Sequence, residues 1–274
     1  LNIPIHNMKK YIYIICVAAV SLFTACEDML DKKPYGQFTA DQLNEEAIEG
    51  LLAAAYAGLE AHYFGNNEAF AGPSTNWIFD VRSDDAVKGG EQVTMEQNIH
   101  QLEISNLTSD NVSNFNKWEN NFYAIARVHN AMKAIYEANI PEDAKLVYLG
   151  ELKTLRAWYY FDLIRIFERI PYFTEVDDPN TVRIDKYTRD EIWGFIKKDC
   201  AEAYTMLPDK GVTAGRFNKY VPAAIHAKVS AQTSSWGEVI QWTDIVINSK
   251  KYELYNNFMD MSKIAFDNKK ESIL

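Results

Sequence analysis

The chain has 274 residues and a formal net charge of −10, and 47% of its residues are hydrophobic and 13% aromatic. This composition predicts a folded protein with a sizeable core and excludes an intrinsically disordered one. The acidic balance argues against a nucleic-acid-binding protein, because such proteins neutralise phosphates with clustered lysine and arginine.

Residues 1–25 have the pattern of a secretory signal peptide. Met-Lys-Lys at residues 8–10 is a short positive segment, and the apolar residues 11–23 that follow are too few to span a bilayer. Phe-Thr-Ala-Cys at residues 23–26 resembles the lipobox of bacterial lipoproteins. We therefore predict cleavage before Cys26 and attachment of lipid, palmitate included, to this cysteine. Ordinary signal cleavage beside an incidental cysteine is the alternative.

A tether over residues 26–40 leads into the region that we expect to fold, residues 41–274. Thr39 and Gln42 have the spacing of a capping box, in which a threonine side chain and a glutamine side chain satisfy the first amides of a helix. The apolar pattern that follows predicts a helix over residues 41–63.

The helical period is lost between Phe64 and Asn114, where glycine, asparagine, aspartate and serine are frequent. A short helix is predicted around residues 91–100. Irregular stretches of this length inside a compact domain are often functional. We therefore expect any recognition chemistry to lie in this stretch.

Two long helices are predicted next, over residues 114–139 and from Glu142 onward. Because only a tight turn at Pro141 separates them, they must be antiparallel neighbours. The second helix should run through residues 151–171, which are apolar on most sides and therefore buried. Pro171 is expected to end it, since the residue before a proline is disfavoured in the helical region.

Asp162 and Arg165 lie three residues apart on this second helix, a spacing that allows an ion pair. Further along the chain, Thr188 and Glu191 form a second capping box. The helices predicted after it cover residues 189–207, a stretch that opens near Asn218, and residues 236–248. Helical hairpins of this size, with alanines where helices would cross, resemble tetratricopeptide repeats. The predicted fold class is therefore all-α, with tetratricopeptide-like repeats and one long irregular loop insertion.

The sequence contains no enzyme motif, and we predict no catalytic residue, no cofactor and no metal ligand. The histidines form neither an HExxH pair nor a Cys/His metal spacing. His129 lies on an apolar helix face and is expected to be a hydrogen-bonded core residue, and Cys200 should pack as a small hydrophobic side chain. The tryptophans at helical spacing should be core residues (Trp118, Trp158, Trp193, Trp242), and Trp236, which opens a helix, should pack in the repeat.

Several stretches, in order, resemble the SusD/RagB-like outer-membrane lipoproteins. They are CEDMLDKKP (26–34), NKWENNFYAIARVHNAM (116–132), RAWYYFDLIRIFERIPYFTE (156–175), GRFNKYVPAAIHAKVSAQ (215–232), WGEVIQWTDIVINSKKYEL (236–254) and KKESIL (269–274). The resemblance implies a non-catalytic protein that is lipid-anchored in the outer membrane and faces the cell exterior. It also implies capture of oligosaccharide and delivery to a SusC-like TonB-dependent transporter.

The same resemblance directs attention to the loop after the first helix, where family members carry part of the ligand face and an aspartate recurs. Here that loop contains Asn76, Trp77, Asp84 and Asp85, which we predict as ligand-binding residues. An aromatic ring can stack on the apolar face of a sugar, and polar side chains can bond its hydroxyls. The alternatives are a packed loop anchor for Trp77 and capping of loop amides by the two aspartates.

Two other functions stay open on sequence alone. A RagB-like member would bind peptide instead of glycan, and a lipid-anchored helical-repeat scaffold would bind other envelope proteins and no nutrient. Family members are about twice this length, so the chain is expected to correspond to an amino-terminal half. Apolar faces that the other half would cover should then be exposed.

Overall fold

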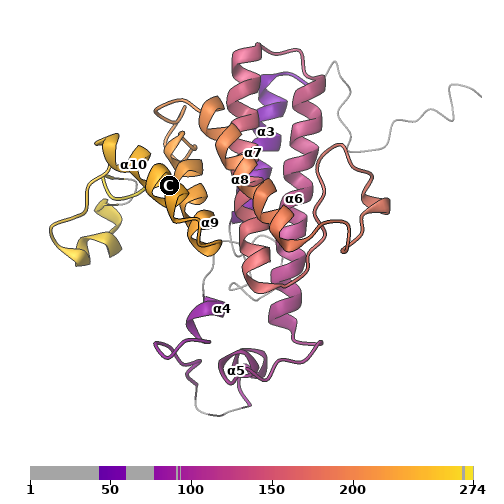
Figure 1. The fold of residues 1–274 in the computed structure, drawn as a ribbon, viewed down its shortest axis with the longest axis vertical. Coiled ribbons are helices and arrows are strands. Elements are labelled where there is room, and N and C mark those ends of the chain that lie inside the picture. Colours follow the sequence, from indigo (N-terminus) through magenta and orange to yellow (C-terminus); the bar gives the residue numbers. More distant parts are fainter. Residues whose placement is uncertain (1–42, 60–76, 91, 93, 267–268, 274) are drawn as a thin grey trace, which may run out of the picture. The chain divides into compact units, whose positions relative to one another are not determined.

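The computed structural model describes residues 43–59, 77–90, 92, 94–266 and 269–273. Within these residues every regular element is a helix and none is a strand (Figure 1). The α-helices are α3 (Glu45–Tyr56), α4 (Trp77–Asp80), α5 (Gln97–Glu103), α6 (Val112–Glu137), α7 (Glu142–Ile166), α8 (Arg189–Met206), α9 (Tyr220–Gln232) and α10 (Trp236–Asn248). Short 3-10 helices are η2 (Ala57–Leu59), η3 (Pro179–Thr181), η4 (Phe258–Ser262) and η5 (Ile264–Phe266).

Helix α7 is the centre of the packing, with α3 and α6 against one side and α8 against another (Figure 1). From α6 onward each long helix packs against the next one along the chain, α6 on α7, α7 on α8, α8 on α9 and α9 on α10. This succession of helical hairpins is the tetratricopeptide-like arrangement that the sequence predicts. The predicted all-α fold class is thereby confirmed.

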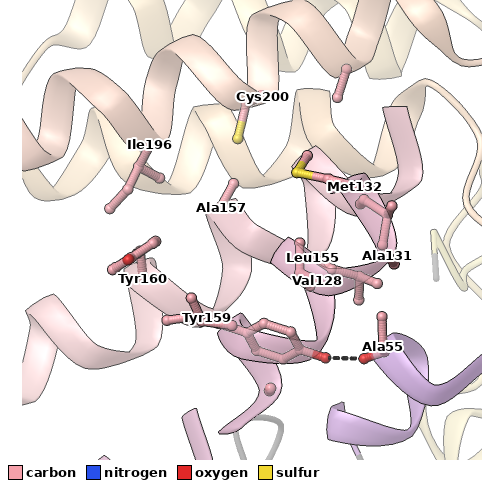
Figure 2. Close-up of a cluster of buried hydrophobic side chains, with 14 of the residues drawn as sticks. Ala55, Val128, Ala131, Met132, Leu155, Ala157, Tyr159, Tyr160, Ile196 and Cys200 are labelled. Atoms are coloured by element: carbon pink, nitrogen blue, oxygen red, sulfur yellow. Dashed lines mark hydrogen bonds between the residues drawn. The ribbon is translucent and has the colours of Figure 1, made fainter. Parts of the chain in front are cut away.

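The main core lies where α3, α6, α7 and α8 meet. Figure 2 shows Tyr159 of α7 directed at α3, where its hydroxyl donates a 2.7 Å hydrogen bond to the Ala55 carbonyl. Cys200 of α8 is fully buried in the same core, as predicted, and Figure 2 shows its thiol facing α7 near Ala157. A Cβ atom at Gly58 would lie 2.7 Å from that of Ala124, so a larger residue could not occupy this approach of η2 to α6.

Buried ion pairs add connections between the helices. Arg156 of α7 donates two hydrogen bonds to Asp199 of α8, at 2.7 and 2.8 Å, and a third to Glu175 at 2.6 Å. Arg216, which precedes α9, pairs in the same bidentate manner with the fully buried Glu151 of α7. Both pairs are planar guanidinium–carboxylate contacts, the geometry that fixes relative orientation most strictly.

Several predicted boundaries are confirmed. The Thr188–Glu191 capping box is present in full at the start of α8. Helix α6 begins two residues before the predicted start and ends two residues before the predicted end, and α10 has the predicted bounds. The predicted short helix is α5, which lies a few residues later than expected.

The first helix starts later than the sequence suggests. Residues 43 and 44 are not helical, and α3 begins at Glu45 with Asn44 as its N-cap, whose side chain accepts a hydrogen bond from the Ala47 amide at 2.9 Å. Asparagine is at least as good an N-cap as threonine, so Asn44 can fill this position. The proposed capping box at Thr39 lies outside the described residues.

Helix α7 ends at Ile166, several residues before Pro171, so the prediction that this proline terminates it is wrong. A distant side chain caps the end of the helix. Arg189, the first residue of α8, donates hydrogen bonds to the carbonyls of Ile164, Phe167 and Glu168. These bonds satisfy carbonyls at the end of the helix that lack a helical amide partner, the Phe167 carbonyl among them, because Pro171 four residues later has no N–H to donate.

Two predicted core positions need correction. Trp236 is not packed in the repeat, because 63% of its surface is exposed at the start of α10. His129 is buried as predicted, but its Nε2 has no hydrogen-bond partner among the described residues. Trp193 and Trp242 are buried, and Trp118 and Trp158 are partly buried against the main core, as expected.

Candidate functional site

The candidate site is the segment of residues 77–85, which begins with the four-residue helix α4. A tight turn follows α4, in which the Ser83 amide and hydroxyl both donate to the Asp80 carbonyl, at 3.1 and 2.7 Å. The Ser83 oxygen in turn accepts a 3.2 Å hydrogen bond from the Asp85 amide. The turn is therefore ordered by its own polar groups.

Apolar side chains on the other side of this segment form a small core separate from the main one. Val81 and the fully buried Leu102 of α5 are its centre, and Phe79, Ile99 and Leu107 pack around them. Ile166, the last residue of α7, belongs to the same cluster. The segment is thus joined to the end of the central helix.

Polar contacts fix the rest of the irregular stretch. The Lys88 amino group donates to the carbonyls of Gly89, Gln92 and Met95 at 3.2, 3.1 and 2.7 Å, which closes the loop between α4 and α5. Asn111 caps α6 and also donates to the Asn98 carbonyl and to the Gln101 side chain. The described part of this long insertion is therefore ordered by specific hydrogen bonds.

Close to this segment, α6 and α7 share a buried ion pair. The Lys117 Nζ atom lies 2.8 Å from Asp162 Oδ2, and the two side chains are 1% and 0% exposed. Asn121 donates to the same oxygen at 3.0 Å. Burial raises the pKa of Asp162 and lowers that of Lys117, although each partner opposes the shift of the other.

The structure places two of the predicted ligand-binding residues on the surface. Asp84 and Asp85 are exposed directly after the turn. No residue in the described part of the chain donates a hydrogen bond to either carboxylate, so the alternative role of capping loop amides has no support there. Ser83 performs that capping instead.

The other predicted site residues are less fully placed. Trp77 is the first residue of α4, and its side chain lies outside the description. Asn76 and the predicted lipid-attachment residue Cys26 lie outside the described residues. Sequence reasoning missed Lys117 and Phe79, because neither has a local pattern that indicates a long-range partner.

One cavity away from this segment has several of its polar side chains already engaged. It has a volume of about 440 Å³ and lies between α3 and residues 213–216, and its side chains Glu49, Tyr56 and Arg216 already bond to one another or to Glu151. Within the described ranges no group of three or more histidine, cysteine or acidic side chains could hold a metal ion. No helix there is both long and apolar enough to cross a membrane.

A family model and individual relatives both identify similarity to SusD-like proteins. Residues 28–230 match a SusD-like family model described as "Starch-binding associating with outer membrane". The SusD-like protein P38 of Formosa agariphila is 27% identical over 177 residues, which are 62% of this chain and 32% of that protein. A SusD-like protein of Bacteroides ovatus is 24% identical over 97% of this chain and 49% of its own length.

Solved structures share the fold. A laminarin-binding SusD-like protein superposes with a TM-score of 0.74 at 22% identity, covering 84% of this chain and 50% of that chain. Surface glycan-binding protein A of Bacteroides fluxus gives a TM-score of 0.71 at 27% identity, covering 84% and 50%. The corresponding Bacteroides thetaiotaomicron protein, in complex with laminarihexaose, gives 0.72 at 21% identity, covering 84% and 48%. The chain thus spans about half the length of most of these relatives.

Proposed function

The chain belongs to the SusD-like family, and from this membership we propose that it binds oligosaccharide at the cell surface and delivers it to a SusC-like TonB-dependent transporter. The observation that carries the proposal is the family match, which extends over residues 28–230 and includes the candidate segment. A structural neighbour of the same fold was solved with laminarihexaose, which supports glycan as the ligand class.

The local geometry supports a binding role without catalysis. Binding a sugar requires ring faces for stacking and polar groups that point outward. The segment offers Asp84 and Asp85 as exposed acceptors on an ordered turn, with no donor to them among the described residues, and Trp77 begins the same segment. Recognition of neutral glycan hydroxyls needs no titrating group, so we place these residues in ligand binding only.

Affinity measurements on the purified protein test this proposal. Titration calorimetry with β-1,3-glucan and starch-type oligosaccharides should detect binding of at least one class. Trp77→Ala should weaken it about tenfold or more, since loss of about 1.4 kcal/mol of stacking is a factor of ten. Asp84→Asn and Asp85→Asn should each weaken it to a smaller degree.

Matched controls separate the site from the rest of the surface. Trp236 is an exposed tryptophan on α10 and Asp244 an exposed aspartate of the same helix, so Trp236→Ala and Asp244→Asn should leave the affinity unchanged. Binding of peptides in place of glycans would assign the protein to the RagB-like alternative. If the protein binds neither class, and no transporter co-purifies with it, the scaffold alternative replaces the proposal.

We also propose that lipid on Cys26 holds the mature protein at the outer membrane, facing the exterior. Mass spectrometry of the mature amino terminus should show a diacylglyceryl and acyl mass on residue 26. Cys26→Ser should release the protein from membranes. An unmodified Cys26 at the mature terminus would remove the anchor from the proposal.

A further inference from the structure

We infer that Arg165 is a positioning residue for the ligand-binding segment 77–85, holding it to the scaffold by stacking on Phe79. This inference rests on the proposed function, because it assigns a role to a residue that would touch no ligand. The Arg165 guanidinium carbon lies 4.6 Å from the centroid of the Phe79 ring in α4 and 4.5 Å from that of Phe161 in α7. A residue of the central helix thus contacts the segment two positions after Trp77.

The guanidinium is held in place from the scaffold side. Arg165 Nη2 donates to Asp162 Oδ1 at 3.0 Å, and the Asp162 side chain is fully buried. The other Asp162 oxygen is occupied by Lys117 and Asn121 at 2.8 and 3.0 Å. Asp162 therefore cannot turn to follow Arg165, and Arg165 cannot leave Phe79 without breaking a partly buried ion pair.

Among the described residues, few side chains of the central helix hold the segment. Helix α4 has four residues, too few to be stable without tertiary contacts. In the small core around Val81 and Leu102, the scaffold residue is Ile166, next to Arg165 in the chain. Two adjacent residues at the end of α7 thus connect the segment to the central helix.

Arginine suits this position for a reason that a substitution can isolate. A planar guanidinium can stack on aromatic rings while its edge pairs with a carboxylate, whereas a lysine ammonium keeps the charge but not the plane. Arg165→Lys should therefore retain an ion pair with Asp162 and lose the stacking on Phe79. Phe79→Leu removes the stacking from the other side, and Phe79→Tyr keeps the ring.

Hydrogen exchange and ligand affinity test the inference together. The Arg82 and Ser83 amides donate to the Phe79 and Asp80 carbonyls at 3.2 and 3.1 Å, so their exchange reports order in the segment. In Arg165→Lys and Phe79→Leu we expect these amides to exchange at least tenfold faster and glycan affinity to fall about tenfold. Exchange in the interior of α7 should not change. Phe79→Tyr should behave as the unmodified protein.

The control is Arg183→Lys, which alters an exposed arginine that pairs with Asp185 at 2.9 Å. It should change neither exchange in the segment nor affinity. Unchanged exchange in Arg165→Lys would overturn the inference, whatever Phe79→Leu does, as would faster exchange with unaltered affinity. If the unmodified protein bound no glycan, the proposed function would fail alone, because the exchange measurement needs no ligand and still decides whether Arg165 holds the segment.

Discussion

At the scale of single residues, Asp162 stands out because one carboxylate serves two parts of the molecule. One oxygen pairs with Lys117 of α6 and the other with Arg165, which contacts the irregular insertion. Removing a charge from water is costly, and a buried pair recovers that cost only when both partners are present. Removing one partner of the pair should therefore cost more stability than replacing both.

We expect Asp162→Asn to destabilise the protein by about 3–5 kcal/mol, because it removes the carboxylate charge that lies 2.8 Å from the buried Lys117 ammonium. The double variant Lys117→Met/Asp162→Leu should lose less folding stability than the single variant Asp162→Asn. Urea unfolding followed by circular dichroism measures both values. A loss below about 1 kcal/mol for Asp162→Asn would show that the pair is hydrated in solution.

His129 makes the stability of the folded protein depend on pH. Burial, reinforced by the nearby Arg156 cation, lowers its pKa from 6.5 to about 3, against the opposing carboxylates of Glu175 and Asp199. Between pH 6.5 and about 3 the unfolded chain therefore binds a proton that the folded protein does not. Stability consequently decreases as the pH is lowered through this range, by up to about 2 kcal/mol between pH 7 and pH 5 for this one residue.

His129→Leu tests whether His129 causes this pH dependence of stability. The substitution breaks no hydrogen bond of Nε2, because this atom has no partner among the described residues. At pH 7 the free energy of unfolding of the variant should lie within about 1 kcal/mol of that of the unmodified protein. Its loss of stability between pH 7 and pH 5 should be smaller by about 2 kcal/mol. An identical pH dependence in the two proteins would show that other groups cause it.

At the scale of elements, local signals determined most of what could be predicted. Thr188 and Glu191 cap α8 from three residues apart, and the apolar period of residues 236–248 suffices to define α10. The end of α7 could not be predicted in this way. Its carbonyls are satisfied by Arg189, more than twenty residues further along the chain, and no local pattern encodes that contact.

In the candidate site, too, local features could be predicted and long-range contacts could not. Composition alone indicated that the irregular stretch was special, and the family resemblance selected Trp77, Asp84 and Asp85 within it. What the sequence could not provide was the means by which the segment is held. Phe79 reads as one more loop aromatic, and Lys117 as a surface lysine, until the fold brings them to Arg165 and Asp162.

At the scale of the whole molecule, α10 presents an apolar outer face. Trp236, Ile240 and Ile247 lie at helical spacing on that face and are 63%, 63% and 61% exposed. Leu254, Phe258 and Ile264 are exposed as well, at 84%, 76% and 89%. The relatives matched over nearly all of this chain are about twice as long. Whether this apolar face is covered in the 274-residue chain can be measured.

We expect the 274-residue chain to self-associate through this face as its concentration increases, since monomers rarely expose contiguous apolar patches of this kind. In a Cys26→Ser background, which removes any contribution from lipid, sedimentation velocity should show a concentration-dependent increase in mass. Trp236→Gln/Ile240→Lys should reduce that increase by placing a charge and an amide in the patch. Val176→Lys, which changes an isolated side chain that is 84% exposed, should not reduce it. A chain that sediments as a monomer at every concentration would contradict the expectation, and equal association of both variants would place the contact elsewhere.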